Sequence, residues 1–509
     1  MLRLLAESSL VPSLSRYGLA MLASIVVWTL GKALYNIYFH PLSKFPGPRM
    51  AAATEWWQAW LEIVEAKSLC LTLVDLHAQY GDIVRIGPDE LHFSKPSAYH
   101  EIYNAKNKWR KNPAFYRYIV SPSESTFSTC EYDRAKKRRD VITPIFSRKS
   151  IISMQDLVQG CIDNMCANID KHIQEKKPFD FLRAFRCCAL DTVTSLCFAK
   201  DAHATSEPGF RAPIGEAMDY TLPLTPIMKH FPTIQIIMNY LSPDVIAWLS
   251  PQLGGYINLR KTLDAQVEEI LRDPDVLARV EHPTIYHAFL GHDPVPSVAE
   301  LRDEALVYVH AGTDTSSDAL AAGTLHVLAD PAVHARLRAE LDAAWPRLDE
   351  PPRYEALEAL PYLTAVVKES LRTSHGVVHP MTRVVPDGGA AISGAFVPGG
   401  TIVAESNIFV HWDATLFPEP RAFRPERWLA KAKDGESLDN WLVPFSKGPR
   451  SCIGINLGYC EIYMTYANLF RKYDLRLEGV GPEDWKWRDC YLPHYLGRDM
   501  KVWATPRLS

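Results

Sequence analysis

The chain has 509 residues, of which 47% are hydrophobic and 22% are charged, and its formal net charge is -4. This balance is typical of a globular protein with one large or two medium domains, and it excludes a strongly basic nucleic-acid-binding protein, so we expect no nucleic-acid partner. Ten cysteines occur without a repeating spacing or a Cys-x-x-Cys pair, which argues against zinc binding and a dense disulfide framework. We therefore expect the folded part of the chain to lie in reducing cytosol.

The N-terminal segment is apolar enough to enter a membrane. Tyr17–Leu30 is a little shorter than the roughly 20 residues that cross a bilayer, but Trp28 suits the interface and Lys32 can extend its charge towards water. A cleaved signal peptide is the competing interpretation. No small-x-small cleavage site follows, so we predict an uncleaved, single-pass anchor over residues 1–38.

A proline-rich segment follows the anchor. Residues 39–49 contain prolines at positions 41, 46 and 48, which hold the backbone extended and stop the preceding helix from continuing. We interpret this segment as a hinge, and residues 50–509 as one folded domain.

The clearest strand signal lies in residues 80–93, where apolar and polar residues alternate on both sides of a Gly-Pro turn and predict a β-hairpin. Residues 150–290 are mostly helical in pattern. The fold class is therefore mainly α with a small β region. Between these segments lie nine basic residues: Lys106, Lys108, Arg110, Lys111, Arg134, Lys136, Lys137, Arg138 and Arg139. Most such runs are solvated faces; the alternative is a docking surface for an acidic partner.

A long helix is predicted from a capping box at Ser297-Val-Ala-Glu300 to Asp330, with Pro331 opening the next helix. Its middle is apolar on nearly every face, so it must be largely buried. Ala311-Gly-Thr-Asp-Thr-Ser316 places a glycine, a carboxylate and hydroxyls there. Such polar groups are either structural, with hydroxyls bonding back to carbonyls, or functional.

The following helix carries an acidic and a basic residue on one face. Glu369 and Arg372 are three residues apart, and Arg427 in a Pro-Glu-Arg segment is a third member. An exposed pair contributes only a few tenths of a kcal/mol. The alternative, a buried network of the three side chains, holds this part of the core in one arrangement.

The loop Phe445-Ser-Lys-Gly-Pro-Arg-Ser-Cys-Ile-Gly454 places Cys452 directly before an apolar helix. Gly448 and Gly454 permit backbone angles and close approaches that a side chain forbids. We expect Arg450 and the first helical amides to hold positive charge beside the sulfur and to favour thiolate, the form that binds metal. The cysteine is therefore a candidate axial ligand of haem iron. The competing interpretation is a buried structural cysteine.

The full Phe-x-x-Gly-x-Arg-x-Cys-x-Gly pattern resembles the haem-binding loop of the cytochrome P-450 family. The proline-rich hinge, the Ala311–Ser316 segment and the Glu369, Arg372 and Arg427 set resemble that family too, so the matches span residues 39–454. The resemblance is to membrane-anchored fungal members of secondary metabolism. It implies a fold in which the haem lies between the long central helix and the helix after Cys452.

The resemblance also implies which residues hold the cofactor, haem b. Cys452 is then the metal ligand, Arg139 and Arg383 bind the haem propionates, and Phe445 and Arg450 complete the cysteine loop. Gly312 leaves room for dioxygen. Ala135 stands where the family usually has Trp or His, so one propionate contact is missing or comes from elsewhere.

The implied activity is that of a haem-thiolate monooxygenase, which inserts one atom of O2 into an apolar small molecule such as a terpenoid or a polyketide-like compound. Asp314 and Thr315 are the implied catalytic residues and deliver protons. Electrons then come from NADPH through a flavoprotein reductase, with cytochrome b5 as a second candidate donor, since no Gly-x-Gly-x-x-Gly unit follows a strand. The implied location is the endoplasmic reticulum membrane, with the catalytic domain on the cytosolic face.

Substrate contacts are also implied by the resemblance. Residues 218–253 correspond to the segment that covers an apolar substrate cavity and touches the membrane. Val377, His379 and the Leu492-Pro-His494 segment correspond to two substrate loops, although a lone histidine is more often structural or exposed.

Two other functions compete with monooxygenation. A haem-thiolate dehydratase or isomerase needs no proton delivery, so the intact pair Asp314 and Thr315 argues against it. A membrane-tethered haem carrier or redox sensor needs no substrate pocket, so the cavity-covering segment argues against that.

Overall fold

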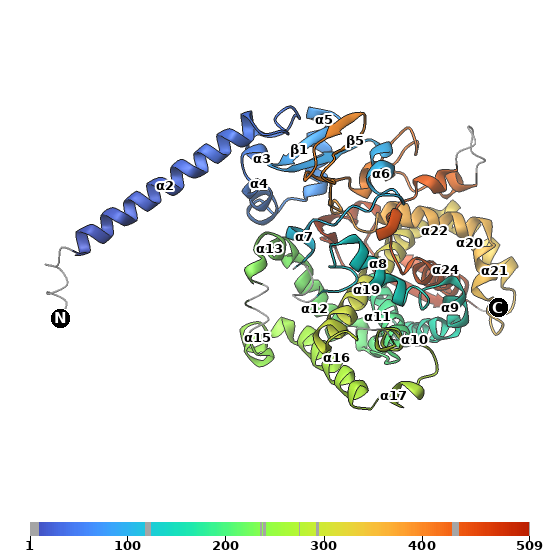
Figure 1. Cartoon of the computed structure of the whole chain (residues 1–509). Coiled ribbons are helices and arrows are strands. Elements are labelled where there is room, and N and C mark those ends of the chain that lie inside the picture. Colours follow the sequence, from blue (N-terminus) through green and yellow to red (C-terminus); the bar gives the residue numbers. More distant parts are fainter. Residues whose placement is uncertain are drawn as a thin grey trace.

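The structure, a computed structural model, describes residues 10–117, 124–234, 237, 241–273, 275–291, 295–429 and 437–507. Its first helix, α2 (Leu10–Tyr38), extends away from the rest of the chain in Figure 1. Within the described ranges, Tyr17–Tyr38 is the one helical stretch long and apolar enough to cross a membrane, and no residue of its apolar 18-residue window is buried. The helix ends where the proline-rich segment begins, and the next helix, α3, begins at Arg49.

The N-terminal part of the domain combines short helices with a sheet. Its elements are α3 (Arg49–Ala53), α4 (Trp56–Ala59), the π-helix η1 (Trp60–Val64), α5 (Leu69–Tyr80), β1 (Ile83–Gly87), β2 (Glu90–Phe93), α6 (Pro96–Ile102), α7 (Pro113–Tyr116) and α8 (Tyr132–Ile142). The predicted hairpin is present, since β1 pairs antiparallel with β2 from Ile83↔Phe93 onwards. The strand β1 is buried on both faces, and Arg85 lies inside because it donates to the carbonyls of Asn36 and Pro88.

The middle of the chain is almost entirely helical. Its elements are α9 (Arg148–Ser153), α10 (Gln155–Gln174), β3 (Phe179–Asp180), α11 (Phe181–Phe198), α12 (Pro213–Thr221), α13 (Thr225–His230), α15 (Pro243–Leu249), α16 (Gly254–Arg272), α17 (Asp275–Ala278), α18 (Ile285–Leu290) and α19 (Val298–Ala329). Short helices therefore hold most of the described residues between 218 and 253, and several of these helices have proline in the first turn.

The C-terminal part returns to the sheet and then to the centre. Its elements are α20 (Pro331–Ala344), α21 (Tyr354–Glu358), α22 (Pro361–Ser374), β4 (Arg383–Val384), β5 (Ala390–Ile392), β6 (Ala395–Val397), β7 (Ile402–Ala404), α23 (Asn407–His411), α24 (Ile455–Lys472), β8 (Tyr473–Leu477), β9 (Trp487–Cys490), β10 (Leu492–Tyr495) and β11 (Lys501–Pro506). The largest sheet has the order β1-β2-β7-β4, and only β2 and β7 run parallel in it.

Helix α19 runs through the centre of the domain and contacts α11, α16, α22 and α24 (Figure 1). Its predicted capping box is present: Ser297 Oγ accepts from the N–H of Glu300, and Glu300 Oε2 accepts from the N–H of Ser297. Asp330 ends the helix and caps α20 by accepting from the N–H of Ala332. The long buried helix predicted from the apolar pattern is confirmed.

The acidic and basic residues on α22 form a buried network. The Arg372 Nε and Nη2 atoms lie 2.9 and 2.8 Å from the two oxygens of Glu369, and both side chains are fully buried. Arg427 Nε and Trp428 Nε1 also donate to Glu369, at 3.1 and 2.9 Å. Because the carboxylate is bonded from three sides, the segment around Trp428 is held against α22. Of the two alternatives, an exposed ion pair or a buried network of the three side chains, the structure contains the buried network.

Candidate functional site

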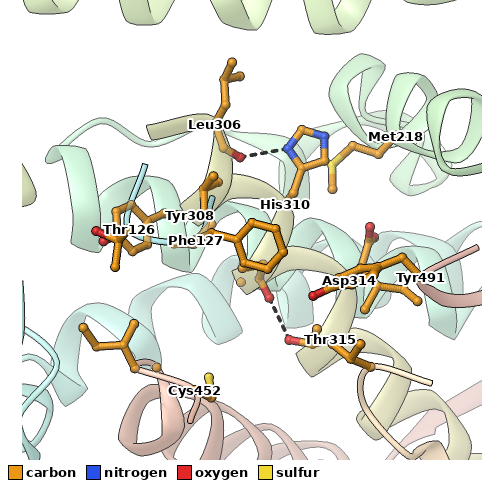
Figure 2. Close-up of a pocket in the computed structure, with 18 of the residues that line it drawn as sticks. Thr126, Phe127, Met218, Leu306, Tyr308, His310, Asp314, Thr315, Cys452 and Tyr491 are labelled. Carbon is orange, nitrogen blue, oxygen red and sulfur yellow. Dashed lines mark hydrogen bonds between the residues drawn. The ribbon is translucent and has the colours of Figure 1, made fainter. Parts of the chain in front are cut away.

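A cavity of about 720 Å³ lies between α19, the cysteine loop and the segment α12–α16. All eight site residues predicted from the sequence line it: Arg139, Gly312, Asp314, Thr315, Arg383, Phe445, Arg450 and Cys452. Figure 2 shows Cys452 at the bottom of the view, with Thr315 and Asp314 of α19 above it. The fold therefore brings residues as far apart in sequence as Arg139 and Cys452 to the walls of one cavity.

The cysteine loop is shaped by backbone contacts. The Cys452 N–H donates to the Phe445 carbonyl at 2.8 Å, which closes the loop. Gly448 has φ +74°, and a Cβ there would lie 2.5 Å from the Tyr103 carbonyl oxygen, so only glycine fits. Gly454 is different, because its φ is -84° and a Cβ there would make an ordinary contact, 3.9 Å from the Cys452 sulfur. The expected need for glycine therefore holds at one of the two positions.

The electrostatics of Cys452 differ from the prediction. Its side chain is accessible from the cavity but enclosed by protein, and this burial raises the pKa of the thiol, while the Gly454 N–H and Arg139 lower it. The prediction that the loop by itself favours thiolate is therefore wrong in direction. Coordination to a metal ion deprotonates a thiol directly, so the loop needs the ion to hold the sulfur as thiolate.

Arg450 does not supply the charge beside the sulfur, contrary to the prediction. Its Nη2 donates to the carbonyls of Cys130 and Glu131, at 2.9 and 3.2 Å, and so ties the cysteine loop to the start of α8. Arg139 of α8 is the cation that acts on Cys452, and its Nη1 donates to the Ser451 carbonyl at 2.6 Å.

Four cations face the cavity around the cysteine loop without acidic partners. Lys111, Arg139, Arg383 and Arg450 all line the cavity, and within the described ranges none of them lies within 4 Å of a carboxylate oxygen in an ion pair. Lys111 is buried, donates to the Phe127 carbonyl at 2.7 Å, and has its pKa lowered well below the usual value by burial and by Arg450. Arg450 Nε is buried without a hydrogen-bond partner.

This cation set fits haem. A buried positive charge without a counter-ion is costly, and the two propionate groups of haem are anions that these cations can bind. Ala135 lies in the same wall and is buried, but its methyl group cannot bond a propionate. The contact that the family usually makes through Trp or His at this position must therefore come from another residue. Lys111 is the additional cation, and sequence reasoning had assigned it to a solvated face. Only the tertiary structure brings it beside Arg383, whose positive charge also lowers the Lys111 pKa.

The α19 wall of the cavity carries a closed ion-pair network. Arg186 of α11 donates from Nε and Nη2 to Asp314 Oδ1, at 2.8 and 2.7 Å, and its Nη1 pairs with Asp219 of α12. Burial lowers the pKa of Arg186, but Asp314 and Asp219 outweigh it and raise the pKa overall. Thr315 Oγ1 donates to the Ala311 carbonyl at 2.7 Å. The described contacts include no hydrogen bond between Asp314 and Thr315, and Asp314 is held by Arg186.

Gly312 has a packing role that the sequence did not indicate. A Cβ at this position would lie 2.8 Å from Val193 Cγ2, so glycine allows α11 and α19 to pack closely. The clearance for dioxygen stays a prediction. Phe445 packs with its ring centroid 5.2 Å from that of Tyr459, which orients the start of the cysteine loop on α24.

A buried carboxylate on α24 was not foreseen from the sequence. Glu461 lines the cavity, and its Oε2 accepts from Ser316 Oγ of α19 at 2.7 Å, while Oε1 is buried without a partner. Burial raises its pKa to about 8, against a smaller opposite effect of the Ser316 hydrogen bond. The carboxyl group is therefore protonated at neutral pH.

The expected substrate segments reach the cavity in part. Residues between 218 and 253 that line it are Met218, Thr221, Leu222, Leu224, Thr225, Met228, Leu241, Ile246 and Leu253. Val377 and Leu492 also line it, whereas His379 and His494 are not among the described lining residues. His379 stacks on Phe115 and lies 3.1 Å from Asp489, so it has the structural role that is more usual for a lone histidine.

A cysteine that faces the cavity, a long helix along the cavity and a group of unpaired cations fit a haem-thiolate protein. The family model described as Cytochrome P450 matches residues 48–489, and the chain belongs to the cytochrome P450 family. It is 35% identical to the cytochrome P450 monooxygenase flvC of Aspergillus flavus, over 95% of this chain and 96% of that protein. It is 31% identical to the tryptophan 6-hydroxylase fscE of Fusarium equiseti, over 87% of this chain and 88% of that protein.

A solved structure has the same fold. The cytochrome P450DA heme domain superposes with a TM-score of 0.72 at 16% identity, covering 91% of this chain and 98% of that one. Membership of the family and the curated relatives make the chain an oxidoreductase of the monooxygenase class, which uses haem and O2 and receives electrons from a reductase. Neither the dehydratase or isomerase nor the haem carrier or sensor is favoured by these relatives.

Proposed function

We propose that this enzyme hydroxylates an apolar fungal secondary metabolite, of terpenoid or polyketide-like structure, inside the cavity between α19 and the segment α12–α16. The observation that carries the proposal is that Cys452 and Thr315 face the same cavity, which is mostly lined by apolar side chains. A cavity of this size encloses a small molecule beside a cofactor. The relative fscE is named a tryptophan 6-hydroxylase, so an aromatic acid is the alternative substrate class.

Five side chains hold the cofactor in this proposal. Cys452 ligates the iron, and Lys111, Arg139, Arg383 and Arg450 bind the propionates. When bound, haem supplies the iron chemistry that splits dioxygen, and a thiolate ligand favours cleavage of the O–O bond. Lys111 takes over the contact that the family usually makes through the residue at position 135.

Asp314 and Thr315 move protons in this proposal. The Thr315 hydroxyl donates to the Ala311 carbonyl in the structure, and rotation about its side-chain bond redirects that proton into the cavity. Asp314 is the group that replaces the proton, because its network reaches solvent through Arg186 to Asp219, whose side chain is 48% exposed. For each proton, the Asp314 carboxylate must leave the Arg186 guanidinium, take up a proton from water at the solvent end of the network, and donate it as a carboxylic acid to the Thr315 oxygen before it returns to Arg186 as carboxylate.

The segment α12–α16 excludes water from the reaction. Its apolar side chains form the wall facing α19, and Lys229 and His230 of α13 hold it to the N-terminal part of the domain through Glu62 of η1, at 2.8 and 2.6 Å. Desolvation raises the pKa of Glu62, but Lys229 and His230 outweigh it and lower the pKa to about 2. Entry of a substrate requires this contact to loosen.

Electrons come from NADPH through a flavoprotein reductase in this proposal, with cytochrome b5 as a second candidate. The exposed basic residues Lys106, Lys108, Lys136 and Lys137 are the proposed docking surface for an acidic partner.

We further propose that residues 1–38 anchor the chain in the endoplasmic reticulum membrane, that residues 39–49 are the hinge, and that residues 50–509 face the cytosol. Deleting residues 1–38 should move the protein from the membrane pellet to the supernatant; continued tight binding to membranes would place the anchor elsewhere.

The test of the activity uses isotopically labelled dioxygen. Membranes carrying the full chain and a reductase are supplied with NADPH, a panel of terpenoid, polyketide-like and aromatic acid candidates, and ¹⁸O₂. We expect one labelled oxygen atom in the product of the accepted substrate, and no labelled product from the Cys452→Ser variant. Products that carry no label from dioxygen, or that form without NADPH, contradict monooxygenation.

A further inference from the structure

His310 lies in the cavity wall of α19, and its ring is held in one tautomer. Its Nδ1 lies 2.8 Å from the Leu306 carbonyl oxygen, as the dashed line in Figure 2 shows. A carbonyl oxygen only accepts, so Nδ1 carries the proton of the neutral ring and Nε2 keeps a free lone pair. The Tyr256 ring packs against the imidazole edge to face, with 5.9 Å between ring centroids, and limits its rotation.

The Nε2 atom is an acceptor without a donor. Within the described ranges no hydrogen bond reaches it, although the side chain is half-buried and lines the cavity. The other polar side chains of this part of the wall are satisfied by each other: Arg302 donates to Asp303 at 3.1 Å and to Asp264 at 3.4 Å. Because its lone pair has no partner in the described chain and the side chain lines the cavity, Nε2 can accept a hydrogen bond from an occupant of the cavity.

The place of His310 relative to the site of chemistry limits what that occupant is. His310 lies five residues before Thr315 on the same helix, which is about 7.5 Å along the helix axis. In Figure 2 it lies at the level of Met218, far from Cys452 at the bottom of the view. A group that donates to Nε2 is thus at the end of the occupant remote from the cysteine.

We propose that His310 Nε2 accepts a hydrogen bond from a hydroxyl or ring N–H group of the substrate. The inference rests on the proposed function, and it narrows the substrate class to apolar molecules with a hydrogen-bond donor at the end opposite the oxidised carbon. The imidazole selects such molecules over analogues in which the donor is methylated, because methylation leaves the acceptor unpaired. His310 is then a specificity-determining residue.

The test compares two probes that differ only in the donor: 2-naphthol and 2-methoxynaphthalene. Their dissociation constants are measured by calorimetry with the full-length, haem-loaded protein in detergent. We expect the wild type to bind 2-naphthol about five- to tenfold more tightly than 2-methoxynaphthalene. His310→Phe keeps a ring for packing against Tyr256 and should abolish the preference, whereas His310→Gln keeps an acceptor and should retain part of it.

Tyr256→Phe is the matched control, because it removes the Tyr256 hydroxyl but keeps a ring that can pack against the imidazole. This variant should leave the preference unchanged. A wild type without a preference for 2-naphthol, including one that binds neither probe, overturns the proposal, and so does a preference that survives in His310→Phe. The same preparations are examined for the carbon monoxide band of haem-thiolate proteins. If the band is present but the wild type shows no preference for 2-naphthol, this inference alone is overturned. If the band is absent, the proposed function is overturned, and calorimetry still shows whether His310 determines the preference.

Discussion

The two polar walls of the cavity treat charge in opposite ways. Around the cysteine loop, cations such as Arg383 and Arg450 bond to backbone carbonyls and have no carboxylate in an ion pair within the described chain. On the α19 wall, one guanidinium, that of Arg186, is shared by the two carboxylates Asp314 and Asp219. The first wall therefore carries cations without acidic partners in the described chain, and the second carries a cation that the protein has already paired with carboxylates.

The difference separates binding from chemistry. A wall of unpaired cations gains stability when an anionic cofactor arrives, because the cost of burying the cations is then offset. A paired wall is stable with or without ligand, and it acts only when an ion pair opens. We therefore expect substitutions in the first wall to reduce cofactor retention, and substitutions in the second to reduce turnover while the cofactor stays bound.

The largest effect is expected from breaking the cation wall. Arg383→Met removes a buried charge that faces the propionates and should weaken haem binding by about 2 kcal/mol or more, on the order of thirtyfold. The haem-to-protein ratio after gel filtration measures it. Arg148→Met is the matched control, since Arg148 forms an ion pair with Glu358 at the surface and does not line the cavity. Equal haem retention in both variants contradicts the assignment of Arg383.

A smaller effect, on turnover alone, is expected from the paired wall. Asp314→Asn should lower the rate of product formation on the order of a hundredfold, because a positioned proton donor is lost, while haem content is unchanged. Asp219→Asn removes the other partner of Arg186 at the surface end and should lower the rate much less. If the two variants are equally slow, the ion pair rather than the Asp314 carboxyl group is what matters.

A smaller effect is expected from Thr315 of α19, on the coupling of NADPH consumption to product formation. Thr315→Ala should let NADPH consumption continue while product formation falls on the order of tenfold, because proton delivery to the oxygen is no longer directed. Thr315→Ser keeps the hydroxyl and should preserve most of the coupling. The measurement is the ratio of product formed to NADPH consumed, and an unchanged ratio in Thr315→Ala removes the residue from proton delivery.

The smallest effect concerns stability and pH. Burial raises the pKa of Glu461 to about 8 from its ordinary value of 4.5, so the folded protein holds a proton that the unfolded chain releases. Glu461 therefore contributes stability that is complete below pH 4.5 and is lost as the pH rises towards 8, with a slope of up to about 1.4 kcal/mol per pH unit. Urea unfolding between pH 6 and pH 8 should show a flatter slope in Glu461→Gln. Glu358→Gln, on the surface, serves as the control, and identical slopes in all three proteins contradict the buried protonated carboxyl.

Much of the fold was predictable because its signals are local. The capping box at Ser297 and the ion pair of Glu369 with Arg372 each depend on residues within a few positions. The membership of Cys452 and Thr315 in one site was predictable only through the family resemblance, since nothing local connects them.

The remainder depends on contacts between distant segments. Arg186 lies 128 residues from its partner Asp314, and Lys111 is separated from Arg383 by most of the chain, so spacing carried no signal for either. The packing role of Gly312 could not be predicted for the same reason, because the neighbour that requires glycine is Val193 on another helix. Arg450 points away from the sulfur because two carbonyls near α8, which the loop sequence does not contain, accept its hydrogen bonds.

The central claim is that Cys452 is the thiolate ligand of haem in a cavity built to receive that cofactor. The measurement that tests it most directly is the carbon monoxide difference spectrum of the reduced, haem-loaded protein, recorded for the wild type and for Cys452→Ser. We predict the red-shifted Soret band of thiolate ligation in the wild type and its loss in the variant. A band that persists in Cys452→Ser, or a haem-loaded wild type without it, would show that another group binds the iron.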